Sequence, residues 1–294
     1  MRTKGLIDLH IHTAASQDGQ YTAREVFKLA RLHGLEAIAF ADHDSVDSVE
    51  EGMRLSGEFG VEFVLAVELT TLREGHELHL LAYYIDPERK ELLELLEEVG
   101  RARMRQAKLR CERLRRYGYT IDYERVLSYS EGKAPTAYPI FRAIMEDPAN
   151  RNFAPTLRYL TGDRSESPTY NFGQDHFNKG KPGYVPVEAM DTAEAVGMVR
   201  GWKAVPVLAH PGRTPLELVE ELVKAGLLGL EAYNPSHTAE QTQRCLETAR
   251  RHGLVVTAGS DFHGPAIKPD IRLGEVKGAG YTLYEGLKDL KKSL

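Results

Sequence analysis

The feature that most constrains the fold of this chain is an alternation of short apolar runs with helical stretches. It occupies the first third of the sequence and returns near the C-terminal end. Near-continuous apolar strands that alternate with helices are typical of parallel βαβ units in an α/β protein. We expect strands at residues 6–12, 37–41, 62–67, 78–85, 205–209, 227–233 and 254–258, and helices at 22–33, 45–59, from 215, and at 239–251.

The middle of the chain interrupts this alternation. Residues 87–117 predict one long helix, and from 133 to 190 the periodicity fades while half of the 14 prolines fall there. A long stretch of this kind inside a compact enzyme is usually a cap, a lid or a binding loop. We therefore expect a core formed by residues 1–100 and 186–294, interrupted by a mainly helical and loop subdomain at 101–185.

Composition and charge exclude several classes of protein. The sequence has no run of 18 apolar residues and no visible secretory signal, so we expect no membrane span. Two distant cysteines do not indicate a disulfide scaffold, and we expect a cytoplasmic protein. A net charge of −5 argues against binding to long duplex nucleic acid, but it allows a small anionic substrate held by a local basic patch.

Histidines and acids gather near the downstream ends of the expected strands, where active sites of parallel barrels assemble. Residues i and i+2 of a strand share a face, so His10 and His12 can reach one ion, and Asp261 and His263 repeat the pattern. Imidazole and carboxylate ligands suit Zn²⁺, Mn²⁺ or Fe²⁺. The alternative is a set of hydrogen-bonded histidines that fill a barrel mouth. The other residues at such positions are Asp42, His43, Glu68, His79 and His210.

These motifs resemble those of the PHP (polymerase and histidinol phosphatase) superfamily. The matching residues are Asp8-Leu-His-Ile-His12-Thr, Ala-Asp42-His43-Asp44, Val-Glu68, His79, Leu-Ala-His210-Pro and Ser-Asp261-Phe-His263. The resemblance implies a distorted (β/α)7 TIM-like barrel that holds two or three divalent ions, Mn²⁺, Zn²⁺ or Fe²⁺. The branch that it resembles most is the TrpH-like phosphoesterases. That branch acts on nucleoside 3′,5′-bisphosphates, on the 5′ end of short RNA, or on cyclic phosphates.

The resemblance also implies a ligand set. The first ion would be held by His10, His12, Glu68 and Asp261. Glu68 would bridge to a second ion, bound by His79 and His210. A third ion would be held by Asp18, His43 and His263. Asp18 is placed differently from the usual family pattern, and its alternative is a simple Asp18-Gly19 turn.

Cationic and proton-transferring residues are expected around this centre. Arg213 follows His210-Pro-Gly, and His237 follows another strand end, so both are candidates to contact phosphate. The resemblance adds Arg142, Lys179 and Lys181 from the insertion, for which solvated surface charges are the alternative. Asp42, His237 and a metal-bound water are the candidates for protonating the leaving oxygen. Asp8 and Asp42 could instead orient imidazoles, and Asp44 could cap the next helix.

The function that these features predict is hydrolysis of small phosphate esters. A hydroxide that bridges two ions would attack phosphorus in line, while the ions and Arg213 neutralise the phosphoryl oxygens. The expected substrates are a nucleoside 3′,5′-bisphosphate, a short oligonucleotide 5′ end, or a sugar or nucleotide cyclic phosphate. The alternatives are a metal-dependent amidohydrolase and a non-catalytic PHP-like binding module, and substrate panels and metal analysis separate the three.

Overall fold

Seven strands form one sheet in the computed structural model, which describes residues 5–130 and 132–294. The sheet follows the chain order: β1 (Leu6–Ile11), β2 (Leu35–Phe40), β3 (Glu62–Arg73), β4 (His76–Tyr83), β5 (Val205–Leu208), β6 (Gly229–Tyr233) and β7 (Val255–Ala258). Ile11 also forms a parallel bridge with Phe262, which follows β7, so segments from the two edges of the sheet adjoin. The predicted α/β fold is confirmed.

One strand differs from the expected parallel alternation. β4 runs antiparallel to both β3 and β5, whereas the pairs β1–β2, β2–β3, β5–β6 and β6–β7 are parallel. A tight hairpin makes the reversal, and Glu74 and Gly75 at its tip have φ of 49° and 77°. The start of β4 therefore lies beside the end of β3, and Thr70 pairs with His79.

Helices cover the outside of the sheet. They are α1 (Ala23–Leu32), α2 (Val49–Phe59), α8 (Thr192–Gly201), α9 (Leu216–Ala225) and α10 (Ala239–His252), with a short 3₁₀ turn η2 (Pro211–Arg213). A further helix, α11 (Tyr281–Lys292), lies at one end of the strands. α1 and α10 each begin with a capping box, in which a threonine side chain and the side chain three residues later cap each other's backbone N–H. Gly60, Gly226 and Gly253 end helices in the left-handed conformation, where a side chain would be strained.

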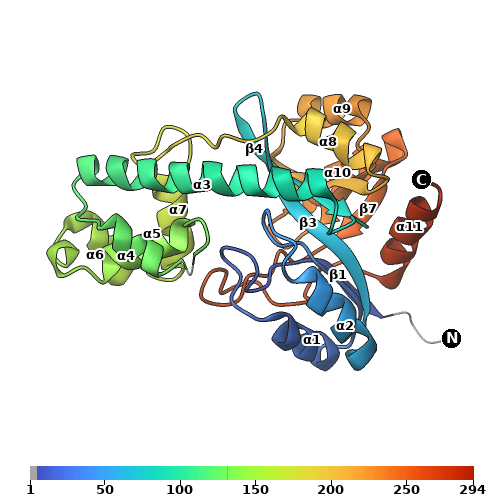
Figure 1. The fold of residues 1–294 in the computed structure, drawn as a ribbon, viewed down its shortest axis with the longest axis horizontal. Helices are drawn as coiled ribbons and strands as arrows, with labels where there is room; N and C mark the ends of the chain where they lie inside the picture. Colours follow the sequence, from blue (N-terminus) through green and yellow to red (C-terminus); the bar gives the residue numbers. More distant parts are fainter. Residues whose placement is uncertain (1–4, 131) are drawn as a thin grey trace. The chain divides into compact units, whose positions relative to one another are not determined.

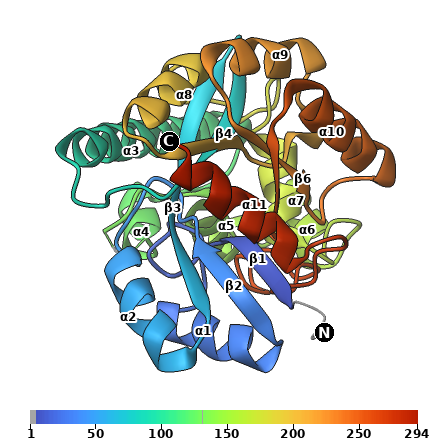
Figure 2. The ribbon, with the colours of Figure 1, turned by 90° about the vertical axis from the view of Figure 1, so that its right-hand side faces the viewer.

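The apolar core has two layers. On one side of the strands, Val26, Phe27 and Leu55 of α1 and α2 pack against Ile38 and Phe40 of β2. On the other side, small and branched side chains of β1 to β5 pack together with Tyr284 and Leu287 of α11. α11 crosses one end of the strands and contacts β1, β2 and β7 (Figure 2). Side chains therefore fill the space on the inner face of the sheet, and α11 covers this space at one end of the strands.

The chain divides into two compact units. Unit 1 comprises Met1–Leu93, Ala189–Gly264 and Asp270–Leu294, and unit 2 comprises Glu94–Glu188 and Pro265–Pro269. Most of the long helix α3 (Lys90–Tyr117) lies in unit 2, and the predicted borders at residues 101 and 185 fall inside that unit. The other helices of unit 2 are α4 (Tyr123–Ser128), α5 (Ala137–Met145), η1 (Pro148–Asn150), α6 (Ala154–Leu160) and α7 (Pro168–His176) (Figure 1).

Unit 2 has an aromatic core of its own. Phe172 is fully buried and packs against Phe141, Tyr159 and His176, whose ring stacks on it at 4.2 Å. Both ring nitrogens of His176 have partners, with Nδ1 near the Phe172 carbonyl and Nε2 near the Tyr119 hydroxyl. This histidine is a hydrogen-bonded core residue. No helix in the described ranges combines the length and apolar character that a membrane crossing requires.

Candidate metal centre

A single buried carboxylate, that of Glu68 on β3, faces five histidines in unit 1. Glu68 has no exposed side-chain surface, and each of the five imidazoles places a ring nitrogen 3.1–3.2 Å from one of its oxygens. Oε2 faces His10 Nε2, His12 Nε2 and His43 Nδ1, and Oε1 faces His79 Nδ1 and His210 Nε2. These histidines come from four separate segments of the chain, so the predicted convergence is present in the structure.

The end of β1 brings two of these histidines together. The β1–β2 register shifts between Asp8 and Ile11, a bulge of the kind that redirects side chains beside active sites. His10 Nε2 lies 3.1 Å from His12 Nε2. Asp261 Oδ1 lies 3.3 Å from His12 Nε2 and 3.8 Å from His10 Nε2, so a second carboxylate reaches the same pair.

Asp18 faces a neighbouring cluster. Its Oδ1 accepts a hydrogen bond from Ser16 Oγ at 2.7 Å, and its Oδ2 lies 3.5 Å from His263 Nε2. The rings of His12 and His263 stack with centroids 3.9 Å apart. Ligand atoms of His12, Asp18, His43 and His263 all lie within 4.8 Å of one another, as do those of His10, His12 and Glu68, and those of His43, Glu68 and His79.

These three groups of ligand atoms share residues in a different way from the three ligand sets that the family resemblance implies. Glu68 is shared by two groups, as the bridging role requires, but His43 is also shared and His12 belongs to two groups. His210 meets the cluster through Glu68 Oε1. The assignment of individual residues to individual ions therefore stays a prediction.

Strained backbone occurs at this site. His210 has φ 31° and ψ 54°, Asp261 has φ 56° and Asp44 has φ 48°, all in the left-handed region that L-residues avoid. Asp44 accepts hydrogen bonds from the Thr70 N–H and the Thr70 Oγ1 at 2.8 and 2.7 Å. The interpretation of Asp44 as a helix cap is wrong, because Ser48 is the N-cap of α2. Its bonds instead tie the chain after β2 to β3.

The electrostatics of the cluster are those of an anion surrounded by imidazoles. Burial alone would raise the pKa of Glu68, but the nearby His43, His10 and His79 hold it well below its usual range. Burial disfavours charge on His12, yet its close contacts with Asp261 and Glu68 raise its pKa to about 9. Burial likewise opposes charge on His79, and Glu68 still raises its pKa to about 10. Cations at this centre would take the place of these protons.

Unsatisfied polar atoms show that the donor set fits metal ions. His43 Nδ1, Glu68 Oε2 and His79 Nδ1 are buried, and within residues 5–130 and 132–294 their close contacts at the Glu68 carboxylate do not have the geometry of hydrogen bonds. Buried polar groups without partners are rare and usually mark an ion, a water or a catalytic role. Imidazole nitrogens and carboxylate oxygens together are the ligands that Zn²⁺, Mn²⁺ and Fe²⁺ prefer.

Two of the predicted catalytic residues are held in the scaffold. The buried carboxylate of Asp42 accepts hydrogen bonds from the Thr13 N–H at 2.6 Å, from Thr13 Oγ1 and from Ser48 Oγ. His237 Nε2 accepts from the Gly212 N–H at 3.0 Å, and its Nδ1 lies 3.0 Å from the Ala232 carbonyl. Because these polar atoms are engaged by other parts of the chain, the geometry favours positioning over proton transfer for both residues.

The predicted phosphate-binding residues lie in two places. Arg213 is exposed on η2, directly after His210. Arg142, Lys179 and Lys181 belong to unit 2 and are exposed. The Arg142 guanidinium already pairs with Glu146 at 2.7 Å and lies 4.2 Å from the Tyr129 ring centre. Phosphate binding by these four residues and by His237 stays a prediction.

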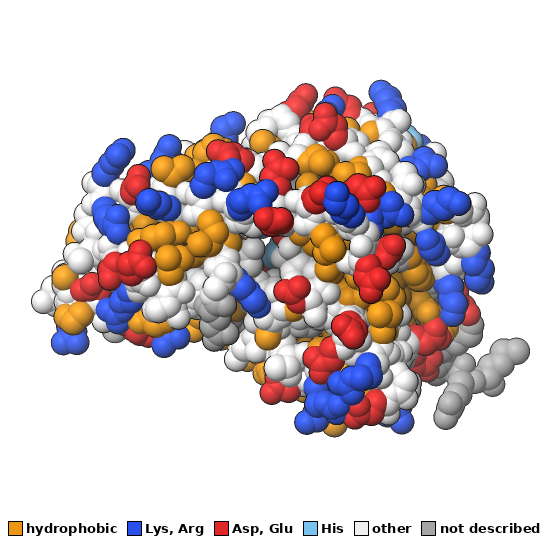
Figure 3. All heavy atoms as spheres, viewed as in Figure 1, with side chains coloured by type: hydrophobic (Ala, Val, Ile, Leu, Met, Phe, Trp, Pro, Cys, Tyr) orange, Lys and Arg blue, Asp and Glu red, His pale blue; other side chains and the backbone are white. Residues whose placement is uncertain are grey.

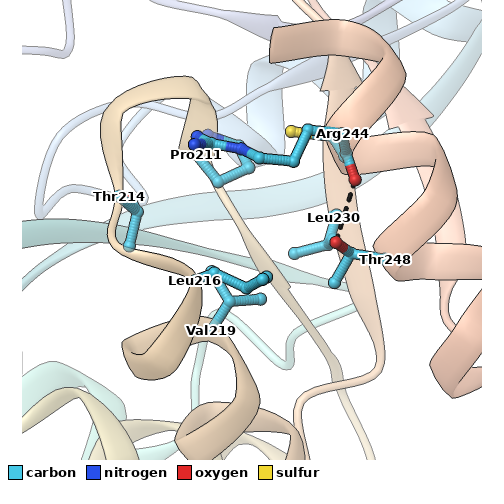
Figure 4. A pocket seen from close by; sticks show the side chains of 8 residues that line it. Pro211, Thr214, Leu216, Val219, Leu230, Arg244 and Thr248 are labelled. Carbon is cyan, nitrogen blue, oxygen red and sulfur yellow. Dashed lines mark hydrogen bonds between the residues drawn. The ribbon is translucent and has the colours of Figure 1, made fainter.

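The turn that carries His210 is held from α10. The Gly212 N–H bonds to His237, and the Gly212 carbonyl accepts from Arg244 at 2.5 Å. Beneath the turn lies a small pocket lined by Pro211, Leu216, Val219, Leu230, Cys245 and Thr248, with the Arg244 side chain extending toward Pro211 (Figure 4). Of the nine predicted metal ligands, all of which the structure describes, none lines this pocket. Its residues support the turn.

Sequence reasoning missed one residue of the site, Glu231 in β6. It is fully buried, its Oε1 lies 3.0 Å from His10 Nδ1, and its Oε2 accepts from the His210 N–H at 2.9 Å. An acid inside an otherwise apolar buried strand was the available signal, because such a group needs polar partners. Asp8 had been expected to orient imidazoles, but its carboxylate accepts from Ser260 and from backbone N–H groups.

The fold and the site together define an α/β metallohydrolase. The protein-family model that describes the PHP domain matches residues 8–138 of this chain. A phosphoribosyl 1,2-cyclic phosphate 1,2-diphosphodiesterase from Eggerthella lenta is 30% identical over 87% of this chain and 94% of its own length. A 3′,5′-nucleoside bisphosphate phosphatase from Chromobacterium violaceum is 28% identical over 88% and 87%, and a 5′-3′ exoribonuclease from Haemophilus influenzae is 25% identical over 88% and 90%.

A solved structure gives the same result. A protein from Bifidobacterium adolescentis, assigned as a metal-dependent phosphoesterase, superposes with a TM-score of 0.78 and 28% identity, covering 97% of this chain and 96% of its own. The chain belongs to the PHP family. It is a metal-dependent phosphoesterase that uses divalent metal.

Proposed function

We propose that this protein hydrolyses small phosphate esters at a centre of two or three divalent ions, Mn²⁺, Zn²⁺ or Fe²⁺. The proposed substrates are a nucleoside 3′,5′-bisphosphate, the 5′ end of a short oligonucleotide, or a sugar or nucleotide cyclic phosphate. The observation that carries the proposal is the buried Glu68 carboxylate with five imidazole nitrogens within 3.2 Å of it. Relatives named for all three substrate types support the range.

The residues of the chain would divide the work as follows. His10, His12, Asp18, His43, Glu68, His79, His210, Asp261 and His263 would hold the ions. Bound divalent ions lower the pKa of water and neutralise phosphoryl oxygens. Arg213, which is exposed at the end of the turn that follows His210, would pair with a substrate phosphate, because a guanidinium can bond two phosphate oxygens at once. His237 would act indirectly, by holding the turn that carries both residues.

The second unit would contribute selectivity. We propose that residues 101–185 act as a cap subdomain, and that Lys179 and Lys181 offer charge to the substrate. Arg142 would have to leave its ion pair with Glu146 to do the same. The face shown in Figure 3 carries acidic and basic side chains intermingled, which supports a small substrate over long duplex nucleic acid. The free, buried thiols of Cys111 and Cys245 suit the proposed cytoplasmic location.

A substrate panel tests the proposal. Purified protein, stripped of metal and reloaded with Mn²⁺, Zn²⁺ or Fe²⁺, would be assayed for phosphate release from nucleoside bisphosphates, 5′-phosphorylated oligonucleotides, cyclic phosphates and p-nitrophenyl phosphate, and for cleavage of amides. We expect turnover of at least one phosphate ester and loss of it with chelator. Turnover of amides alone would favour the amidohydrolase alternative, and a protein that binds metal but hydrolyses neither class would favour a binding module.

A further inference from the structure

The interior of unit 1 contains a buried acid that the proposed ligand set does not use. Glu231 on β6 is fully buried, and so is its partner His10. Glu231 Oε1 lies 3.0 Å from His10 Nδ1, and its other oxygen accepts from the His210 N–H at 2.9 Å and from Asn234 Nδ2 at 3.2 Å. One carboxylate therefore contacts two histidines of the candidate centre, one through its ring and the other through its backbone.

This contact determines which nitrogen of His10 is available. A carboxylate can only accept, so His10 Nδ1 donates its hydrogen to Glu231. The other ring nitrogen, Nε2, then has a free lone pair, and it is the atom that lies 3.2 Å from Glu68 Oε2 and 3.1 Å from His12 Nε2. A hydrogen bond to the remote nitrogen also makes an imidazole a stronger ligand.

The second contact acts on the strained backbone. His210 has φ 31°, a conformation that a non-glycine residue adopts only when its surroundings hold it there. The bond from the His210 N–H to Glu231 Oε2 is such a restraint, and Asn234 orients the same oxygen by bonding both to it and to the Gly259 carbonyl. Glu231 thereby fixes the backbone position from which the His210 side chain projects.

The backbone at Gly259 packs closely against this pair. A Cβ atom added to Gly259 would overlap the Cβ of His10 and would lie 2.5 Å from Glu231 Oε1. Among the described residues, no ion pair with lysine or arginine reaches Glu231, although an isolated buried charge is costly. The negative charge of Glu231 is stabilised by the hydrogen bonds that the carboxylate accepts and by positive charge at the histidines of the centre.

We infer that Glu231 is a positioning residue of the metal centre: it orients His10 so that Nε2 faces the ions, and it fixes the backbone of His210. The inference rests on the proposed metal centre. It deepens that proposal by assigning a role to a residue outside the nine ligands. In Glu231→Gln, the amide NH2 group would replace one of the two carboxylate oxygens. If it faces His10 Nδ1, the ring proton of His10 moves to Nε2. If it faces the His210 N–H, two donors oppose each other and this hydrogen bond is lost.

Zn²⁺ affinity of the whole chain tests this role. Metal-free wild type and Glu231→Gln would be titrated with Zn²⁺ against a chelating indicator, with folding checked by circular dichroism. We expect the dissociation constant of the variant to rise by about 10- to 100-fold, as for other partners of metal-bound histidines. The matched control is Tyr83→Phe, which removes a buried hydrogen bond to the Leu9 carbonyl without touching an imidazole. The Zn²⁺ affinity of Tyr83→Phe should stay within about threefold of wild type, which is a smaller change than the loss of a hydrogen-bond partner of a metal-bound histidine causes.

Equal Zn²⁺ affinity in folded Glu231→Gln and wild type would overturn the inference and leave the metal centre intact, whereas a wild type that binds no Zn²⁺ would overturn both. If the variant does not fold, nitrogen-15 NMR of histidine-labelled, Zn²⁺-loaded wild type decides. We expect the His10 proton on Nδ1. A proton on Nε2 would contradict the role given to Glu231.

Discussion

At the scale of single residues, Glu68 and the histidines around it carry the chemistry. His10→Ala removes a nitrogen that faces both Glu68 and His12, and Asp261→Ala removes an oxygen that faces His10 and His12. Each variant should lose bound metal and phosphoesterase activity together. The activity should fall at least about 100-fold, because loss of a residue that only supports a metal ligand already costs up to about that much. Metal analysis and turnover measured on the same sample check this.

The control is His76→Ala, which removes an exposed histidine from the start of β4, outside the cluster. It should retain both metal and activity. Full metal occupancy in an inactive His10→Ala protein would show that this histidine serves another purpose.

Protons and metal ions compete for the same nitrogens. Burial lowers the pKa of His12 and His79, but bonds with Asp261 and Glu68 raise that of His12 to about 9, and Glu68 raises that of His79 to about 10. The raised pKa values favour the protonated form of both imidazoles in the metal-free protein, and a nitrogen must be deprotonated to bind metal.

Metal binding at pH 7.5 should therefore release protons, and affinity should increase as the pH rises from 7 toward 9. Isothermal titration with Zn²⁺ in buffers of different ionisation enthalpy measures the number released. An enthalpy that does not depend on the buffer would contradict the expected displacement of protons.

At the scale of elements, the turn η2 determines where His210 and Arg213 lie. A methyl group on Gly212 would lie 2.5 Å from His237 Cδ2 and 2.8 Å from its Nε2, so Gly212→Ala must displace the turn or the His237 ring that holds it. Since a misplacement of about 1 Å can cost about 100-fold in rate, we expect kcat/KM to fall at least about tenfold while the fold persists. Steady-state kinetics and a thermal melt measure the two effects.

Gly57→Ala is the matched control, because a Cβ there meets nothing within 4 Å on α2. It should leave kcat/KM unchanged and stabilise the helix slightly. Equal kinetics for both alanine variants would show that the turn tolerates displacement.

α11 is attached to the sheet through Glu62. The Tyr281 and Tyr284 hydroxyls donate to its two oxygens, and Lys288 Nζ lies 3.1 Å away. Glu62→Gln should lower the free energy of unfolding by about 1 kcal/mol, because the bonds are charge-assisted but the carboxylate is 42% exposed. Asp289→Asn, which removes a more exposed carboxylate that pairs with Lys292 at 2.7 Å, should cost less.

The pH dependence of this effect has a definite sign. Burial raises the pKa of Glu62, but the tyrosine and lysine bonds lower it below 4.5 overall. The contribution of the charged form is present above that pH and is lost as the pH falls through the lower pKa of the folded protein. Denaturant unfolding at pH 7 and pH 3.5 should show the difference between wild type and Glu62→Gln shrink at the lower pH.

Some elements could be predicted from the sequence and others could not. The helices α1, α9 and α10 and the strands other than β3 lie within a few residues of their predicted positions, because apolar runs and C-terminal glycines mark them. β3 runs on to Arg73, beyond its predicted end at residue 67. The direction of β4 was not predictable from alternation, which is the same for either direction. α11 went unpredicted, because its burial depends on packing against the distant strands β1, β2 and β7.

The candidate site shows the same division. His10 and His12 lie in an i, i+2 pattern that predicts shared ligation, and the structure brings their nitrogens to 3.1 Å. Glu231 contacts His10 across 221 residues of sequence, and no spacing encodes such a contact. The occupied hydrogen bonds of Asp42 and His237 likewise depend on which loops meet in three dimensions.

At the scale of the whole molecule, an alternating strand and helix core brings distant segments to one buried carboxylate, and a second compact unit interrupts that core. The claim on which everything else depends is that cations lie among these side chains. Anomalous X-ray scattering from crystals grown with Mn²⁺ or Zn²⁺ tests it most directly. We expect at least two peaks within bonding distance of the Glu68, His10 and His79 ligand atoms. A map without peaks there, in crystals saturated with metal, would contradict the account.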